Sequence, residues 1–197
     1  MTPTELRILD ATKACYERWG MSKVTIDDIA AEAGVSRATL YRMFPGGKDV
    51  LFDALRVREL EVFFVGLGEH LSGVAQLDDL LVRTVVYATG QLRDDDHLAV
   101  MLASEPGAVL KDLTVQGLPR IIRMASLFLA PKVEPFLDRE RAGQLVELLA
   151  RLVISYFLAP SDRVDLGDPE SARAFIVTHL LPTFTLPTLT TPTGALS

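Results

Sequence analysis

Apolar residues recur along this chain mainly at intervals of three and four positions. Such spacing places apolar side chains on one face of an α-helix, whereas a half-buried β-strand would need strict alternation of apolar and polar residues. No segment sustains that alternation. The sequence therefore predicts an all-α protein, with three short helices at the N-terminus followed by a larger helical bundle.

The three short helices are predicted because capping residues and helix-ending glycines punctuate the first fifty positions. A serine or threonine hydroxyl accepts a hydrogen bond from a free N–H group at the start of a helix, and glycine readily adopts the backbone conformation that ends one. With these signals the helices run from Thr4 to Trp19, from Thr25 to Ala33 and from Ser36 to Phe44. The turn Pro45-Gly46-Gly47 closes the third helix.

Longer helices are predicted beyond this turn. Their approximate ranges are 48–71, 77–92, 95–103, 106–113, 118–129, 138–158 and 169–180. The last two are apolar over a wide face and are joined by a short polar connection, so we expect them to pack as an antiparallel pair.

Three parts of the chain follow from this pattern: a first domain at 1–47, a helical domain at 48–182, and a tail at 183–197. The tail holds six threonines, two prolines and no charged residue, which predicts a flexible segment. Phe184, Leu186 and Leu189 are the tail residues able to dock on the bundle.

The segment from Thr25 to Leu51 has the form of a helix-turn-helix. Gly34 permits the sharp reversal between its two helices, and apolar residues such as Ile29 and Leu40 can hold the pair together. In such a motif the second helix enters the major groove of DNA, with its first residues against the base edges. Its outward-facing residues would be Arg37, Ala38, Thr39 and Arg42, with Tyr41 placed to reach a phosphate.

Charge is unevenly divided along the chain. The net charge of −6 arises wholly after residue 50, because the first fifty residues hold seven basic and seven acidic side chains. Arg37, Arg42 and Lys48 lie within twelve residues, and Asp49 is the only acid between Ala33 and Phe52. This local basic cluster is compatible with a surface that binds nucleic acid.

The N-terminal segment resembles the DNA-binding domain of the tetracycline-repressor (TetR) family. The resemblance covers about the first 52 residues and is carried by Ile8-Leu9-Asp10-Ala11, Gly20, Val24-Thr25, Ile29-Ala30, Ala33-Gly34-Val35-Ser36, Thr39-Leu40-Tyr41, Phe44, Lys48 and Leu51. It implies phosphate contacts from Thr25, Tyr41 and Lys48, and base or backbone contacts from Ser36, Arg37, Thr39 and Arg42. Met43 departs from the pattern: the family usually has tyrosine or histidine there, and a thioether donates no hydrogen bond to phosphate.

The resemblance also implies a ligand-responsive transcriptional repressor. The second part of the chain is rich in large apolar side chains, which either fill a core or line a cavity. The expected pocket residues are Phe63, Phe64, Leu67, Tyr87, Leu98, Met101, Leu102, Met124 and Phe128. The polar side chains expected near them are Tyr87, His97, Ser104 and Glu105. The expected effector is therefore a hydrophobic small molecule with one polar end.

The resemblance further implies a homodimer that binds a palindromic operator with two symmetry-related subunits. The interface is expected on the last two long helices. Its residues would be Leu145, Leu148, Leu149, Leu152, Ile154, Phe157, Phe175 and Ile176.

Catalysis and metal binding have little support in the sequence. His70, His97 and His179 lie on separate predicted helices without the spacing of a metal site, and Gly46-Gly47-Lys48 lacks the spacing of a phosphate-binding loop. We expect no catalytic residue, no metal and no cofactor. The single cysteine, Cys15, the absence of a readable signal peptide and the absence of a long apolar run indicate a cytoplasmic protein without a membrane partner.

Two other functions remain open from the residues alone. One is a constitutive DNA-binding dimer whose second part only dimerises. The other is a helical carrier or enzyme for a hydrophobic molecule, in which the N-terminal motif has lost its role. A ligand-sized cavity would distinguish an effector-responsive protein from a constitutive one, and DNA retardation would exclude the carrier or enzyme.

Overall fold

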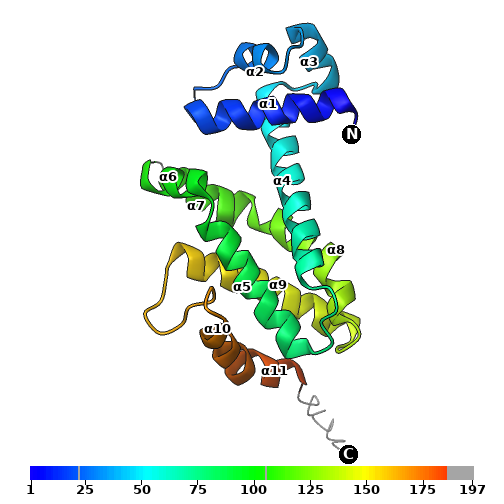
Figure 1. The fold of residues 1–197 in the computed structure, drawn as a ribbon, viewed down its shortest axis with the longest axis vertical. Coiled ribbons are helices and arrows are strands. Elements are labelled where there is room, and N and C mark those ends of the chain that lie inside the picture. The colour runs from blue at the N-terminus through cyan, green and yellow to red at the C-terminus, as the bar shows by residue number, and fades with distance from the viewer. Residues whose placement is uncertain (22, 105, 186–197) are drawn as a thin grey trace, which may run out of the picture. The chain divides into compact units, whose positions relative to one another are not determined.

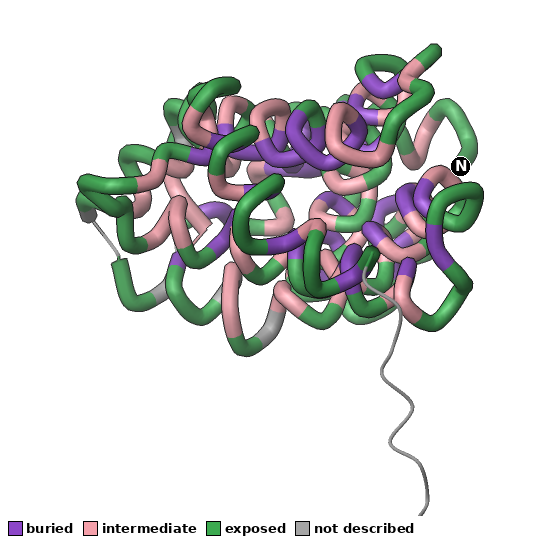
Figure 2. Tube along the Cα trace, turned by 90° about the horizontal axis from the view of Figure 1, so that it is seen from below, coloured by how far each residue is buried: buried purple, intermediate pink, exposed green. Residues whose placement is uncertain are grey.

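The computed structural model describes residues 1–21, 23–104 and 106–185, and within these ranges the regular secondary structure is helical (Figure 1). The all-α prediction is thus confirmed. The chain forms two compact units, Met1–Phe63 and Phe64–Ser197. Buried stretches alternate with exposed ones along the helices, as expected where each helix buries one face (Figure 2).

The first unit contains α1 (Pro3–Trp19), α2 (Ile26–Glu32), α3 (Arg37–Met43) and the first part of α4 (Lys48–His70). The predicted starts at Thr25 and Ser36 are confirmed, since both residues cap their helices. The start of α1 was predicted too late. Thr2 is its cap, because the Thr2 hydroxyl accepts from the backbone N–H of Glu5 and the Glu5 carboxylate accepts from the N–H of Thr2.

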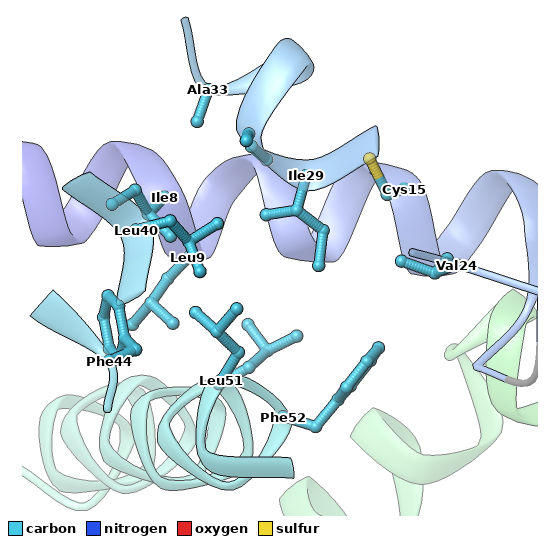
Figure 3. Close-up of a cluster of buried hydrophobic side chains, with 13 residues drawn as sticks. Ile8, Leu9, Cys15, Val24, Ile29, Ala33, Leu40, Phe44, Leu51 and Phe52 are labelled. Carbon is cyan, nitrogen blue, oxygen red and sulfur yellow. The ribbon is translucent and has the colours of Figure 1, made fainter. Parts of the chain in front are cut away.

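The core of the first unit is formed by apolar side chains from all four helices (Figure 3). Its fully buried members include Ile8 and Leu9 on α1, Ile29 on α2 and Leu40 on α3. On α4, three residues complete this core: Leu51, Phe52 and Leu55. The first unit therefore extends to Phe63, past the boundary expected at residue 47, because the start of α4 has its apolar partners in α1–α3.

The second unit begins with the remainder of α4. It continues through α5 (Leu77–Arg93), α6 (Asp96–Ser104), α7 (Pro106–Leu110), the π-helical turn η1 (Lys111–Gln116), α8 (Leu118–Val133), α9 (Arg139–Leu158), α10 (Pro169–Phe175), the π-helical turn η2 (Ile176–Leu180) and α11 (Leu181–Thr185). α8 runs beyond its predicted end and through Pro131, because Leu129 and Val133 are buried and anchor its last turn.

Packing within the second unit differs in one respect from the prediction. α8 packs along α9, but α10 packs chiefly on α5, so α9 and α10 are not the expected antiparallel pair. Ion pairs fix this arrangement: Arg173 on α10 binds Asp78 at 2.8 Å and also binds Asp79, both on α5. α9 touches α10 through the rings of Tyr156 and Phe175, whose centroids are 5.8 Å apart.

The start of the predicted tail is helical. Phe184 on α11 is buried, and its carbonyl oxygen accepts a hydrogen bond from Nη1 of Arg141 at 3.2 Å. Docking of Phe184 explains why the helical chain continues past residue 182. Leu186, Leu189 and the rest of the tail lie outside the described residues. No described helix has the length and apolarity that crossing a membrane requires.

Candidate nucleic-acid interface

The reversal between α2 and α3 is made by a glycine in the left-handed region. Gly34 has φ of 62°, a conformation that is costly for residues with a β-carbon. The backbone N–H of Gly34 donates to the carbonyl of Ala31 at 3.1 Å, and that of Val35 donates to the carbonyl of Ala30 at 3.0 Å. These hydrogen bonds close the turn that ends α2, and α3 follows it as the second helix of the motif.

Thr25 binds Asp28 through three hydrogen bonds at the start of α2. The backbone N–H and the hydroxyl of Thr25 donate to Oδ2 of Asp28 at 3.0 and 2.6 Å, and the Thr25 hydroxyl accepts from the N–H of Asp28 at 3.2 Å. These bonds from the Thr25 hydroxyl and backbone lower the pKa of Asp28. The Thr25 side chain is exposed, as a phosphate contact requires, but its proton is directed at Asp28.

Ser36 performs the equivalent role at the start of α3. Its Oγ accepts from the backbone N–H of Thr39 at 3.1 Å and lies 2.9 Å from the hydroxyl oxygen of Thr39. Ser36 is exposed and Thr39 is half-buried. The two hydroxyls therefore form one polar group at the N-terminal end of the second helix.

The outward face of α3 holds the residues expected there. Arg37, Ala38, Tyr41 and Arg42 are exposed, and Arg42 has no ion-pair partner among the described residues. Met43 is half-buried and packs against the core of the first unit. The departure from the family pattern at this position thus contributes an apolar contact and no donor.

Arg37 has a partner that the sequence did not reveal. Its Nη1 atom lies 3.2 and 3.1 Å from the two carboxylate oxygens of Asp27 on α2. Its guanidinium carbon lies 5.6 Å from the ring centroid of Tyr41, one turn further along α3. A hydrogen bond with the Tyr41 side chain raises the pKa of Arg37 most, and the negative charge of Asp27 raises it further. One signal in the sequence could have identified Asp27. Two acids, Asp27 and Asp28, stand at the start of α2, and the capping box uses only Asp28, which leaves Asp27 available for another partner.

Tyr41 and Lys48 lie close to the turn that follows α3. A β-carbon built on Gly47, which has φ of 70°, would lie 3.3 Å from Cε1 of Tyr41. Nζ of Lys48 lies 5.9 Å from the ring centroid of Phe52. Phe52 belongs to the core of the first unit, so the ammonium group of the half-buried Lys48 lies over a ring of that core.

The second unit brings together some of the expected pocket residues. Phe64 on α4 stacks on Phe128 on α8, with centroids 5.5 Å apart and ring planes inclined by 12°. Tyr87 on α5 lies beside α4: its ring is 5.2 Å from that of His70, and its hydroxyl oxygen would be 2.5 Å from a β-carbon on Gly66. α4 thus makes two ring contacts, one with α8 and one with α5.

The other expected pocket residues are spread more widely. Leu67 is buried on α4, whereas the half-buried remainder lie on other helices: Leu98, Met101 and Leu102 on α6, and Met124 on α8. Phe63 is the last residue of the first unit. The side chains of His97, Ser104 and Glu105 lie outside those described.

The expected interface residues fall into two groups. Leu145, Leu149, Ile154 and Ile176 are buried within the subunit itself, where they contribute to its core. Leu148 is 37% exposed, and three others are half-buried: Leu152, Phe157 and Phe175. Only this second group offers surface to a partner. Among the residues described, no group of three or more His, Cys, Asp or Glu side chains could hold a metal ion.

Comparison with known proteins agrees with this geometry. Residues 8–55 match the family model described as bacterial regulatory proteins, tetR family. The chain is 27% identical over 190 residues to an HTH-type transcriptional regulator of Mycobacterium bovis, covering 89% of this chain and 90% of the relative.

Solved structures share the fold. The TetR family repressor AlkX from a Dietzia strain is 24% identical, with a TM-score of 0.65 over 89% of this chain and 93% of AlkX. The regulator FadR of Bacillus subtilis, solved with stearoyl-CoA, is 18% identical, with a TM-score of 0.54 over 88% of this chain and 97% of FadR. Residues 8–55, which contain the helix-turn-helix, thus form an N-terminal domain of the tetR family of bacterial regulatory proteins.

Proposed function

We propose that this protein is a homodimeric repressor that binds a palindromic DNA operator and is released from it by a hydrophobic small molecule. The observation that carries the proposal is the outward face of α3, where Arg37, Tyr41 and Arg42 are exposed next to Ser36. Arginine can donate two hydrogen bonds to a guanine, and a tyrosine hydroxyl can donate to a phosphate.

The proposed operator contacts are of two kinds. Arg37, Thr39 and Arg42 lie on the helix that enters the major groove in this motif, so they are the residues assigned to base edges. Ser36, Tyr41 and Lys48 are assigned to phosphates, which position the domain without reading sequence. Thr25 is assigned to a phosphate as well, which requires its hydroxyl proton to turn away from Asp28. Ala38 is small and exposed, and allows close approach of α3 to the groove.

The proposed dimer surface lies on α9 and α10. Leu148 and Leu152 are four residues apart on α9, so both point to the same side of that helix. Phe175 on α10 adds a half-buried ring. Together with Phe157 these residues supply apolar surface that a second subunit could cover. The fully buried Leu145, Leu149 and Ile176 would support this surface from within the subunit.

The proposed effector site is lined by Phe64 and Phe128, which stack on each other, and by Tyr87, whose phenol is its polar group. FadR was solved with stearoyl-CoA, and AlkX is implicated in the biodegradation of n-alkanes. These relatives support an effector with a long apolar chain. α4 carries both Phe64 and Lys48, so an effector held at one end of this helix can act on a DNA contact at the other.

Release by an effector requires that the effector bind the DNA-free geometry more tightly than the DNA-bound one, since equal affinity shifts nothing. The decisive experiment has two steps. Purified protein selects duplexes from fragmented genomic DNA, and fatty acyl and aromatic compounds are then tested for release of the selected duplex. Selection without release by any compound would favour a constitutive DNA-binding dimer, and failure to select DNA would favour a carrier.

A further inference from the structure

Asp27 is an acid on the surface that the proposed function assigns to DNA. Its carboxylate receives both hydrogen bonds from Nη1 of Arg37, at 3.1 and 3.2 Å. Both side chains remain open to solvent, with 60% of Arg37 and 68% of Asp27 exposed. An exposed pair of this kind adds little to folding stability, so its effect must be sought in how it holds Arg37.

The pair leaves most of the arginine fork available. A guanidinium has five N–H donors, and a single nitrogen makes both bonds to Asp27. The guanidinium carbon of the same group lies 5.6 Å from the ring centroid of Tyr41. A carboxylate and an aromatic ring thus restrict Arg37 from two helices, while other donors remain to bind a guanine. Arg42, one turn further along α3, has no ion pair among the described residues.

Asp27 also changes which DNA groups Arg37 can approach. A phosphate placed at Arg37 would lie near the Asp27 carboxylate and be repelled by it, whereas the edge of a neutral base would not. An unpaired arginine has no such bias, because phosphates attract it at every sequence. The pair therefore disfavours docking geometries in which Arg37 lies on the DNA backbone.

We infer that Asp27 is a positioning residue, which holds Arg37 for one base and so increases sequence discrimination by the protein while lowering its affinity for DNA of other sequence. This inference rests on the proposed function, because it requires α3 to read DNA. A flexible side chain loses conformational entropy when it is immobilised on binding. If the side chain is already restricted in the free protein, this cost is avoided, which corresponds to about a two- to tenfold change in affinity for one side chain.

The test compares Asp27→Asn with a matched control, Asp49→Asn. Both acids lie in the first turn of a helix of the first unit, but only Asp27 forms an ion pair with Arg37. Each substitution removes one negative charge, so both should raise affinity for all DNA to a similar small degree. Each purified protein selects from a pool of randomised duplexes, and affinities are then measured for the selected site and its single-base variants.

In Asp27→Asn we expect about two- to tenfold weaker discrimination at one base position per half-site. That position is the one at which Arg37→Ala loses its preference. We expect Asp49→Asn to keep the discrimination of the parent protein. Asp27→Glu keeps the charge and should retain more discrimination than Asp27→Asn. Circular dichroism and thermal melting of each variant check that its overall helical content and stability match those of the parent protein.

Two results overturn the inference and are separable from failure of the proposed function. If Arg37→Ala loses preference at one position but Asp27→Asn does not, Asp27 does not position Arg37. If Asp27→Asn and Asp49→Asn behave alike, Asp27 contributes only its charge. If instead the parent protein selects no common sequence, the proposed function itself fails.

Discussion

The ring of Tyr41 lies against the backbone of Gly47, so that a β-carbon at Gly47 would be 3.3 Å from Cε1 of Tyr41 and 3.7 Å from its hydroxyl oxygen. Gly47 is buried and has φ of 70°. The turn after α3 thus positions the phenol that is assigned to a phosphate. Its glycine is needed both for the backbone conformation and for the space that the ring occupies.

Gly47→Ala should therefore weaken both folding and operator binding. The left-handed backbone alone should lower the free energy of unfolding by about 1–2 kcal/mol. Gly73→Ala is the matched control, because Gly73 has φ of 75° and open space around its Cα. Urea unfolding should show a loss in both variants, whereas a DNA retardation assay should show weaker binding only in Gly47→Ala. Equal operator affinity in the two variants would show that Tyr41 placement does not matter.

Lys48→Ala should weaken binding to every DNA sequence, because a phosphate contact carries no sequence information. The slope of log affinity against log salt should decrease by about 0.9 for the contact that is lost. Lys13→Ala is a suitable control, since Lys13 lies on α1 and binds Glu59 at 2.8 Å. Titrations at several salt concentrations measure the slope, and an unchanged slope in Lys48→Ala would remove Lys48 from the interface.

Asp28 predicts a pH dependence of stability in the first unit. Hydrogen bonds from the side chain and backbone of Thr25 lower its pKa from the ordinary value of 3.8. A lowered pKa in the folded state means that the stabilisation is complete above 3.8 and is lost as the pH falls through the folded-state value. Asp28→Asn should therefore melt below the parent protein at neutral pH, and this difference should decrease on acidification below pH 3.8. A difference that stayed constant with pH would contradict the assignment.

Local sequence signals predicted most of the helix boundaries in the first unit. Capping residues at Thr25 and Ser36 and the glycine at position 34 act on their nearest neighbours, so their effects can be predicted from the sequence without knowing the fold. The Asp27–Arg37 pair could not be predicted in this way, because it depends on the angle at which α2 and α3 meet. The compact first unit ends at Phe63 and not at residue 47 for a related reason: only the fold shows that Leu51 packs with the core of α1–α3.

In the second unit, periodicity identified apolar faces but not their partners. Leu145 and Leu148 both contribute to the apolar face of one helix in the sequence, yet the first is fully buried and the second is 37% exposed. The difference arises because other helices pack on one side of α9. Sequence spacing therefore could not separate residues of the core from residues available to a second subunit.

The proposed effector site predicts a stabilising ligand. A compound that binds only the folded protein at one hundred times its Kd should stabilise it by about 2.7 kcal/mol. Phe128→Ala removes the ring that stacks on Phe64 and should reduce the thermal shift caused by acyl or aromatic compounds. Phe136→Ala, which removes an exposed ring outside the proposed site, should retain the shift. A shift of equal size in both variants would place the binding site elsewhere.

The proposed dimer surface predicts opposite outcomes for two leucines on one helix. Leu148→Glu places a charge at an exposed position, so the subunit should fold and fail to associate. Leu145→Glu places a carboxylate in the core, where an unpaired charge is strongly unfavourable, so this variant should not fold. Sedimentation and circular dichroism together distinguish a helical monomer from an unfolded chain. A folded Leu148→Glu monomer should also lose operator affinity, because each half-site would then be bound alone. Dimers of undiminished stability in Leu148→Glu would move the interface away from this face of α9.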